Sequence, residues 1–87
     1  MTNIKDFAKS IRDRNPDCKK VYIAIMPSAE NNYLLEIEIS PREEIAGSYY
    51  VNSSDLDKVR RLADRLDNEL NSLGFEVVKD RKEWEDQ

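Results

Sequence analysis

The chain has 87 residues, of which 39% are hydrophobic and 37% are charged, and its formal net charge at pH 7 is −4. This length suits one domain with a small core, and the acidic balance argues against nonspecific binding to nucleic acid or to an anionic membrane. Cys18 is the single cysteine, so an internal disulfide is excluded. Because the sequence shows no secretion leader and no long apolar run, we expect a soluble cytoplasmic protein with a reduced thiol.

The charge is distributed unevenly along the chain. Residues 1–20 contain six basic and three acidic residues, and residues 21–57 contain one basic and seven acidic residues. Residues 58–87 contain seven basic and eight acidic residues. The middle of the chain is therefore its acidic part, and a surface built from it would attract basic groups.

The first predicted helix covers residues 3–14. Its apolar residues recur at the spacing of one helical face: Ile4, Phe7, Ala8 and Ile11. Thr2 or Asn3 can cap this helix, and Pro16 stops it because the residue before a proline avoids the helical region.

A β-hairpin is predicted next, from residues 19–27 and 33–40. In the first segment both alternating sides are apolar, which is typical of a central strand. The second segment has one apolar side, made of Tyr33, Leu35, Ile37 and Ile39. That side must meet Val21, Ile23 and Ile25, since a slip of one residue would turn it toward water. The intervening turn is rich in asparagine, which tolerates a left-handed backbone.

The sequence predicts a loop at residues 41–47 and a short third strand at residues 48–51. Ser54 with Asp57 then fits a capping box for a second helix, with Asp where Glu or Gln is commoner. The apolar residues of this helix are spaced three and four apart: Leu56, Val59, Ala63, Leu66, Leu70 and Leu73. Gly74 ends the helix, and Phe75 stands where a Schellman motif places its hydrophobic contact.

Residues 75–78 are predicted to form a fourth strand, reached by a β-α-β crossover that should be right-handed. The predicted order is α-β-β-β-α-β, which is an α+β fold with a mainly antiparallel sheet and two helices packed on one face. Residues 1–78 make the single domain, and residues 79–87 make a charged tail that contains Trp84.

The opposite face of the sheet, called the outer face below, is the predicted partner-binding surface. Glu36 and Glu38 lie on it about 6.5–7 Å apart, given the rise of a strand. The residues expected to contact a partner are Glu36, Glu38, Glu43, Glu44, Tyr22, Met26, Leu34 and Tyr50. Carboxylates would set specificity and association rate, and apolar anchors would hold the complex. Solvated glutamates, or a patch covered by the tail, a loop or a second copy, are the plainer alternatives.

Motifs that indicate catalysis or a bound cofactor are absent from the sequence. It contains no histidine, only two glycines, and no P-loop, GxGxxG, CxxC, HExxH or GxSxG pattern. A metal at Glu43 and Glu44 would need further ligands, so we predict no catalytic residue, cofactor or metal. Charges on the second helix should pair along its surface, for example Asp57 with Arg61 and Arg65 with Glu69.

Three resemblances accompany these patterns. The order α-β-β-β-α resembles that of double-stranded-RNA-binding domains, although the last helix opens with the acidic SSDLDK where those domains carry a basic cluster. The hairpin followed by GSYYVNSSDLDKVRRLADRL is similar to HicB-like antitoxins. In size and acidity the chain resembles small phage and mobile-element inhibitors, including anti-CRISPR proteins, some of which present carboxylates where an enzyme expects phosphates.

The leading hypothesis is a non-enzymatic protein-binding module, a small phage or mobile-element inhibitor that occludes a nucleic-acid-binding partner through its acidic surface. It implies a protein partner, no direct contact with nucleic acid and no membrane. The alternative is an antitoxin-like or transcription-related homodimeric regulator. A third possibility is nucleic-acid binding by the basic N-terminal residues Lys5, Lys9, Arg12, Arg14, Lys19 and Lys20.

Overall fold

The computed structural model describes residues 3–39 and 44–79. Its elements are α1 (Ile4–Arg14), β1 (Lys20–Pro27), a 3-10 turn (Ala29–Asn31), β2 (Tyr33–Ile39), β3 (Glu44–Val51), α2 (Leu56–Ser72) and β4 (Glu76–Lys79). The α+β class and the order α-β-β-β-α-β are thereby confirmed. The predicted tail with Trp84 lies outside the described residues, apart from Lys79, which ends β4.

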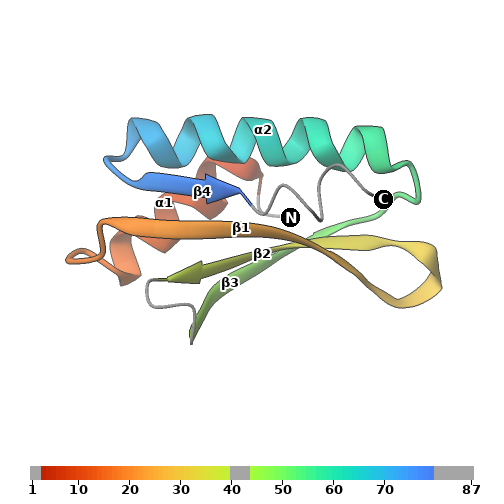
Figure 1. Cartoon of the computed structure of the whole chain (residues 1–87), viewed down its shortest axis with the longest axis horizontal. Helices are drawn as coiled ribbons and strands as arrows, with labels where there is room; N and C mark the ends of the chain where they lie inside the picture. Colours follow the sequence, from red (N-terminus) through yellow and green to blue (C-terminus); the bar gives the residue numbers. More distant parts are fainter. Residues whose placement is uncertain (1–2, 40–43, 80–87) are drawn as a thin grey trace.

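The four strands form one mixed sheet in the order β3-β2-β1-β4 (Figure 1). β1 pairs antiparallel with β2, and β2 pairs antiparallel with β3, whereas β4 runs parallel to β1. α2 therefore connects two parallel strands, β3 and β4, and its crossover passes over β2 and β1. Both helices lie on the same side of the sheet, as the sequence predicted.

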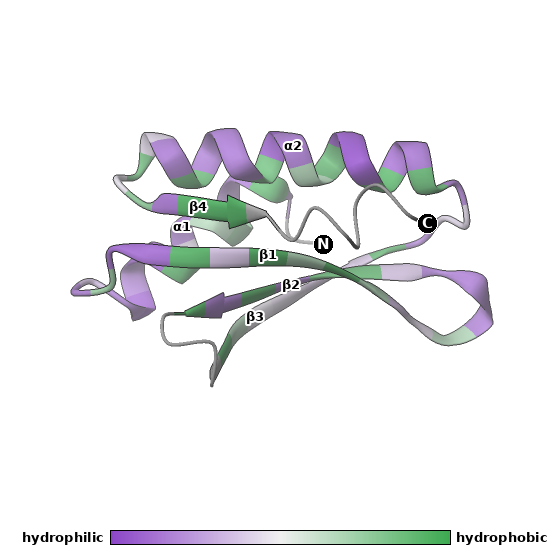
Figure 2. Ribbon diagram, viewed as in Figure 1, coloured by the Kyte–Doolittle hydropathy of each residue, from purple (hydrophilic) through white to green (hydrophobic). Residues whose placement is uncertain are grey.

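The core lies between the helices and the inner face of the sheet. α1 contributes its apolar stripe of Ile4, Phe7, Ala8 and Ile11, and α2 contributes Val59, Ala63, Leu66 and Leu70. The strands contribute Val21, Ile23, Ile25, Leu35, Ile37 and Val51. Figure 2 shows the solvent side of α2 in purple and its sheet side in green, so the amphipathic pattern determines which face of each helix is buried.

The hairpin register is the one that the apolar patterns require. Ile23 lies opposite Ile37, and Ile25 lies opposite Leu35. These four side chains are at most 3% exposed, which confirms that the apolar side of β2 faces the helices. In the turn, Glu30 has φ 59° and Asn31 has φ 64°. The left-handed asparagine was expected, whereas the left-handed glutamate was not.

At the ends of α2 the predicted C-terminal motif is confirmed, whereas the predicted N-cap is wrong. The N-cap is Asp55, whose Oδ1 accepts from the Asp57 backbone N–H at 3.0 Å, so the predicted capping box of Ser54 with Asp57 is wrong by one residue. At the other end Gly74 has φ 94°, and the Phe75 N–H donates to the Leu70 carbonyl. This pattern confirms the Schellman motif.

β3 is longer than predicted. A loop was predicted up to residue 47, but the strand begins at Glu44. The pairing with β2 shifts there: Ile37 lies opposite Gly47 and Glu38 lies opposite Ile45, which leaves Ala46 as an extra residue in a β-bulge. A bulge breaks the two-residue alternation by which strands are recognised, and this explains why the first half of β3 was missed.

Arg12 joins the C-terminal ends of the two helices. Its Nη2 donates at 2.8 Å to three carbonyls of the loop after α1, those of Asn15, Pro16 and Cys18. Its Nη1 donates to the Leu73 carbonyl at 3.4 Å, and its guanidinium lies 4.0 Å from the centre of the Phe75 ring. One arginine therefore donates to carbonyls of the loop after α1 and of the C-cap of α2.

Candidate functional site: the outer face of the sheet

The outer face is the side of the sheet that the helices do not cover. By strand register it consists of Lys20, Tyr22, Ala24 and Met26 of β1, Leu34, Glu36 and Glu38 of β2, Ile45, Ser48 and Tyr50 of β3, and Glu76 and Val78 of β4. Six of the eight predicted contact residues are therefore on one surface, although their binding role stays a prediction. Glu43 and the side chain of Glu44 lie outside the described part of the structure.

Cross-strand pairs arrange these side chains in three rows, with the ion pair of Lys20 and Glu76 beyond the first row. The first row contains Ile45, Glu38, Tyr22 and Val78, the second contains Ser48, Glu36 and Ala24, and the third contains Tyr50, Leu34 and Met26. The two carboxylates are thus in adjacent rows of one inner strand, and the third row is entirely apolar or aromatic. Neighbours on one face of a sheet are close enough to act together on a partner.

Exposure varies strongly across this face. Tyr50 is 72% exposed and Ile45 is 59% exposed, and both belong to β3. Glu36, Glu38 and Leu34 are half-buried. Ala24, in the middle of β1, is only 2% exposed, so the centre of the face is already shielded from water. A partner would therefore contact the larger side chains around Ala24.

The residues directly opposite Glu36 and Glu38 are uncharged, whereas Lys20 lies on the same face beside Tyr22. The residues paired with them across the strands are Ala24 and Ser48 for Glu36, and Tyr22 and Ile45 for Glu38. Glu38 is engaged in an interaction of its own. Within the described residues no group of three or more His, Cys, Asp or Glu side chains could hold a metal ion. The chemistry that this pair offers is therefore recognition of cationic groups.

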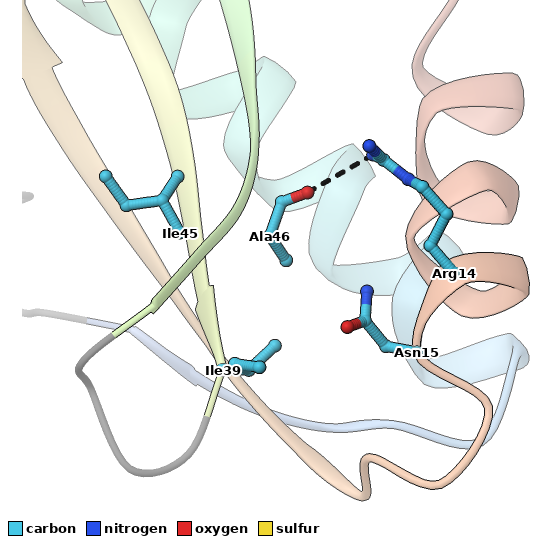
Figure 3. Close-up of a pocket in the computed structure, with 5 residues that line it drawn as sticks. All are labelled: Arg14, Asn15, Ile39, Ile45 and Ala46. Carbon is cyan, nitrogen blue, oxygen red and sulfur yellow. Dashed lines mark hydrogen bonds between the residues drawn. The ribbon is translucent and has the colours of Figure 1, made fainter.

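A second surface feature lies where α1 ends beside the start of β3. It is an open pocket of about 370 Å³, lined by Arg14, Asn15, Ile39, Ile45 and Ala46 (Figure 3). Arg14 donates to the carbonyls of Ala46 and Ser10, and Asn15 donates to the Ile11 carbonyl. These hydrogen bonds to the backbone hold Arg14 and Asn15 at the rim of the pocket.

Four of the six basic N-terminal residues have contacts at different places in the structure. Arg12 is used to join the helix ends, and Arg14 bonds to β3. Lys20 lies near Glu76 at 3.9 Å and its ammonium is 5.9 Å from the Tyr22 ring centre. Lys5 lines a separate pocket between the helices, next to Arg65. A nucleic-acid interface would require these charges to converge on one side.

The charge pairing along α2 also differs from the prediction. Asp57 pairs with Arg60, with 3.3 Å between Oδ1 and Nη1, and not with Arg61. Within the described residues no ion pair joins Arg65 to Glu69. Arg61 and Arg65 instead line a shallow pocket with Lys58 and Leu62. The pairing of i with i+3 thus replaces the expected pairing of i with i+4 at the start of the helix.

Sequence reasoning did not place five members on the outer face: Lys20, Ile45, Ser48, Glu76 and Val78. Ile45 was placed in a loop because of the bulge, and Val78 was not connected to Tyr22 because the position of β4 in the sheet was unknown. A parallel partner for a strand that is apolar on both sides was the available signal. The described part of the chain contains no helix with both the length and the apolarity needed to cross a bilayer.

Comparisons of the chain with models of known protein families, with curated proteins and with solved structures each found no match. The function therefore has to be argued from the geometry of the molecule.

Proposed function

We propose that this protein is a non-enzymatic binding module whose outer face covers a basic, nucleic-acid-binding surface of a protein partner in the cytoplasm. The observation that carries the proposal is the pair Glu36 and Glu38, placed in adjacent rows of β2 and bordered by exposed apolar side chains on the face that neither helix covers. In this role it acts as an inhibitor of the kind found in phages and mobile elements.

Burial of the apolar side chains contributes the favourable free energy that holds the complex together. Tyr50 and Ile45 are the large apolar side chains that remain mostly exposed in the described residues. Burying each against a partner gains about 25 cal/mol for every square ångström of apolar area removed from water. Aromatic anchors of this kind often account for much of the affinity of an interface.

The carboxylates select for a basic partner. A nucleic-acid-binding surface presents lysine and arginine side chains that normally meet phosphates. Glu36 and Glu38 offer charged acceptors to such side chains, and attraction between opposite charges speeds the encounter. A partner bound in this way could not use the same side chains to hold its nucleic acid, so inhibition would follow from occlusion.

The proposal is tested by affinity capture from nuclease-treated host lysate with three forms of the protein. They are the wild type, the double reversal Glu36→Lys with Glu38→Lys, and the control Asp13→Lys with Glu69→Lys. Each double variant changes the net charge by the same amount, but Asp13 and Glu69 lie on the helices. We expect a basic protein that is retained by the wild type and the control and lost by the outer-face variant.

Two further measurements connect capture to function. Binding of the purified partner should weaken as salt is raised, and the Glu36→Lys, Glu38→Lys variant should show a flatter salt dependence. The wild type should also displace nucleic acid from the partner in a mobility-shift titration. Equal capture by all three forms, or a partner that binds the protein and its nucleic acid simultaneously, contradicts the proposal.

A further inference from the structure

The two edges of the sheet differ in how well they are protected against pairing with another strand. β4 is four residues long and carries charged residues at both ends, Glu76 and Lys79. β3 is eight residues long, and no residue from 45 to 51 is charged. Edge strands of soluble proteins are normally short, charged, bulged or covered, because unpaired backbone groups attract a further strand.

In the part of the chain that the structure describes, the features that protect β3 lie in its first half. The bulge at Ala46 interrupts the edge there, and the Arg14 guanidinium donates to the Ala46 carbonyl at 3.2 Å. Figure 3 shows this bond reaching the strand from the end of α1. Within residues 3–39 and 44–79, no element other than β2 hydrogen-bonds to residues 48–50. These residues therefore present a regular, neutral edge.

The side chains of this segment also favour an approach from the edge. Tyr49 packs inward, with its ring centre 5.3 Å from that of Phe7, so the backbone is held in place. Ser48 is exposed, and Tyr50 is 72% exposed. A strand laid beside β3 would gain backbone hydrogen bonds and cover the exposed Tyr50 ring without moving a core residue.

We propose that the end of β3 pairs antiparallel with the same strand of a second copy, with Tyr50 opposite Tyr50 and Tyr49 opposite Val51, so that two sheets join into one across a two-fold axis perpendicular to the sheet. An antiparallel pair of identical strands is self-complementary, as a two-fold interface requires. The segment is neutral, so like charges do not meet directly within it.

Charge distinguishes this arrangement from the other way of pairing two copies through their sheets. Stacking two outer faces would bring Glu36 and Glu38 of one copy against the acidic rows of the other, which opposes association. Pairing at the edge keeps these carboxylates on the open side of the joined sheet. The inference goes beyond the proposed function and does not depend on it, since the dimer forms with or without a basic partner.

The test combines sedimentation equilibrium over a range of concentrations with amide hydrogen exchange. We expect the wild type to pass from monomer to dimer as its concentration rises, with slower exchange of backbone amides in residues 48–51 at the higher concentrations. Tyr50→Lys and Tyr50→Glu should each raise the dimer dissociation constant about tenfold, because like charges then face each other across the axis. Tyr50→Phe is the neutral control and should still dimerise.

Mixing the two charged variants makes the test specific for this edge. Tyr50→Lys and Tyr50→Glu should recover dimerisation together, because position 50 of one copy then lies close to the opposite charge of the other. A wild type that remains monomeric up to about 1 mM overturns the proposal. So does a dimer in which the amides of residues 48–51 exchange as fast as in the dilute protein, since such a dimer would be held through another surface.

Discussion

The two faces of β2 belong to one seven-residue strand but perform different tasks. On the inner face Leu35 and Ile37 are completely buried, whereas on the outer face Leu34 and Glu36 remain partly exposed. Successive side chains of a strand point to opposite faces, so a change of one position along the chain moves a residue from the core to the surface. Stability and recognition can therefore be tested separately within the same strand.

The two faces of β2 also depend on each other. The inner face fixes the register of the sheet, because a slipped register would expose its apolar side chains. The register in turn decides that Glu36 lies beside Ala24 and Glu38 beside Tyr22. The outer surface is thus positioned by residues that no partner can reach.

The largest expected effect comes from the inner face. Ile37→Ala should lower the free energy of unfolding by about 2–5 kcal/mol, because it removes buried methyl groups and leaves a cavity. Leu34→Ala, the matched change on the outer face, should cost under about 1 kcal/mol because Leu34 keeps part of its exposure. Urea unfolding followed by circular dichroism measures both. Equal losses would show that the outer face is as well packed as the core.

The next effect concerns Arg12, which fixes the helix layer at one end. Arg12→Ala should cost about 1.5–3 kcal/mol, since several carbonyls at the helix ends lose a charged donor. Arg12→Lys should recover only part of this loss, because an ammonium cannot reproduce the planar donor arrangement over Phe75. Lys9→Ala is the control on an exposed position of the same helix. A loss no larger than that of Lys9→Ala would contradict the role given to Arg12.

A smaller effect is expected at the close approach of α1 to β3. A Cβ atom on Gly47 would lie 2.8 Å from Ile11 Cδ1 and 3.1 Å from Phe7 Cε1. Gly47→Ala should therefore cost about 1–3 kcal/mol through overpacking. Ser48→Ala changes the adjacent residue on the outer face and should stay within about 0.5 kcal/mol. Thermal unfolding of the two variants measures the effect on each face at neighbouring positions. A stabilised Gly47→Ala protein would show that the Ile11 and Phe7 side chains move aside without cost.

Much of this fold could be predicted because its signals are local. The apolar spacing of α1 and α2, the alternation in β2 and the glycine that ends α2 each lie within a few residues of the structure that they specify. The failures have physical causes as well. The bulge at Ala46 removes the alternation from β3, and Asp55 rather than Ser54 is the cap because several neighbouring residues were all capable of capping.

Less of the candidate site could be predicted, because it depends on which strands become neighbours. The outer position of Glu36 and Glu38 followed from alternation, but Val78 joins them only because β4 pairs with β1. Arg12 was interpreted as a candidate for nucleic-acid binding, since a sequence does not show that its partners are backbone carbonyls. One of these, the Leu73 carbonyl, is 61 residues away along the chain. A hydrogen bond from a side chain to a distant backbone carbonyl leaves no recognisable pattern in the sequence.

The smallest expected effect on stability is the most informative about function. Glu36→Lys should change the free energy of unfolding by less than about 0.5 kcal/mol, because Glu36 is half-exposed and its cross-strand neighbours Ala24 and Ser48 are uncharged. The same variant should weaken capture of the proposed basic partner, since an ammonium would then face the partner's own cations. Glu36→Gln removes the charge and nearly keeps the shape, so its capture of the partner should lie between that of the wild type and that of Glu36→Lys. If Glu36→Lys unfolds the protein, the glutamate has a structural role, and the two faces of β2 are less independent than their burial indicates.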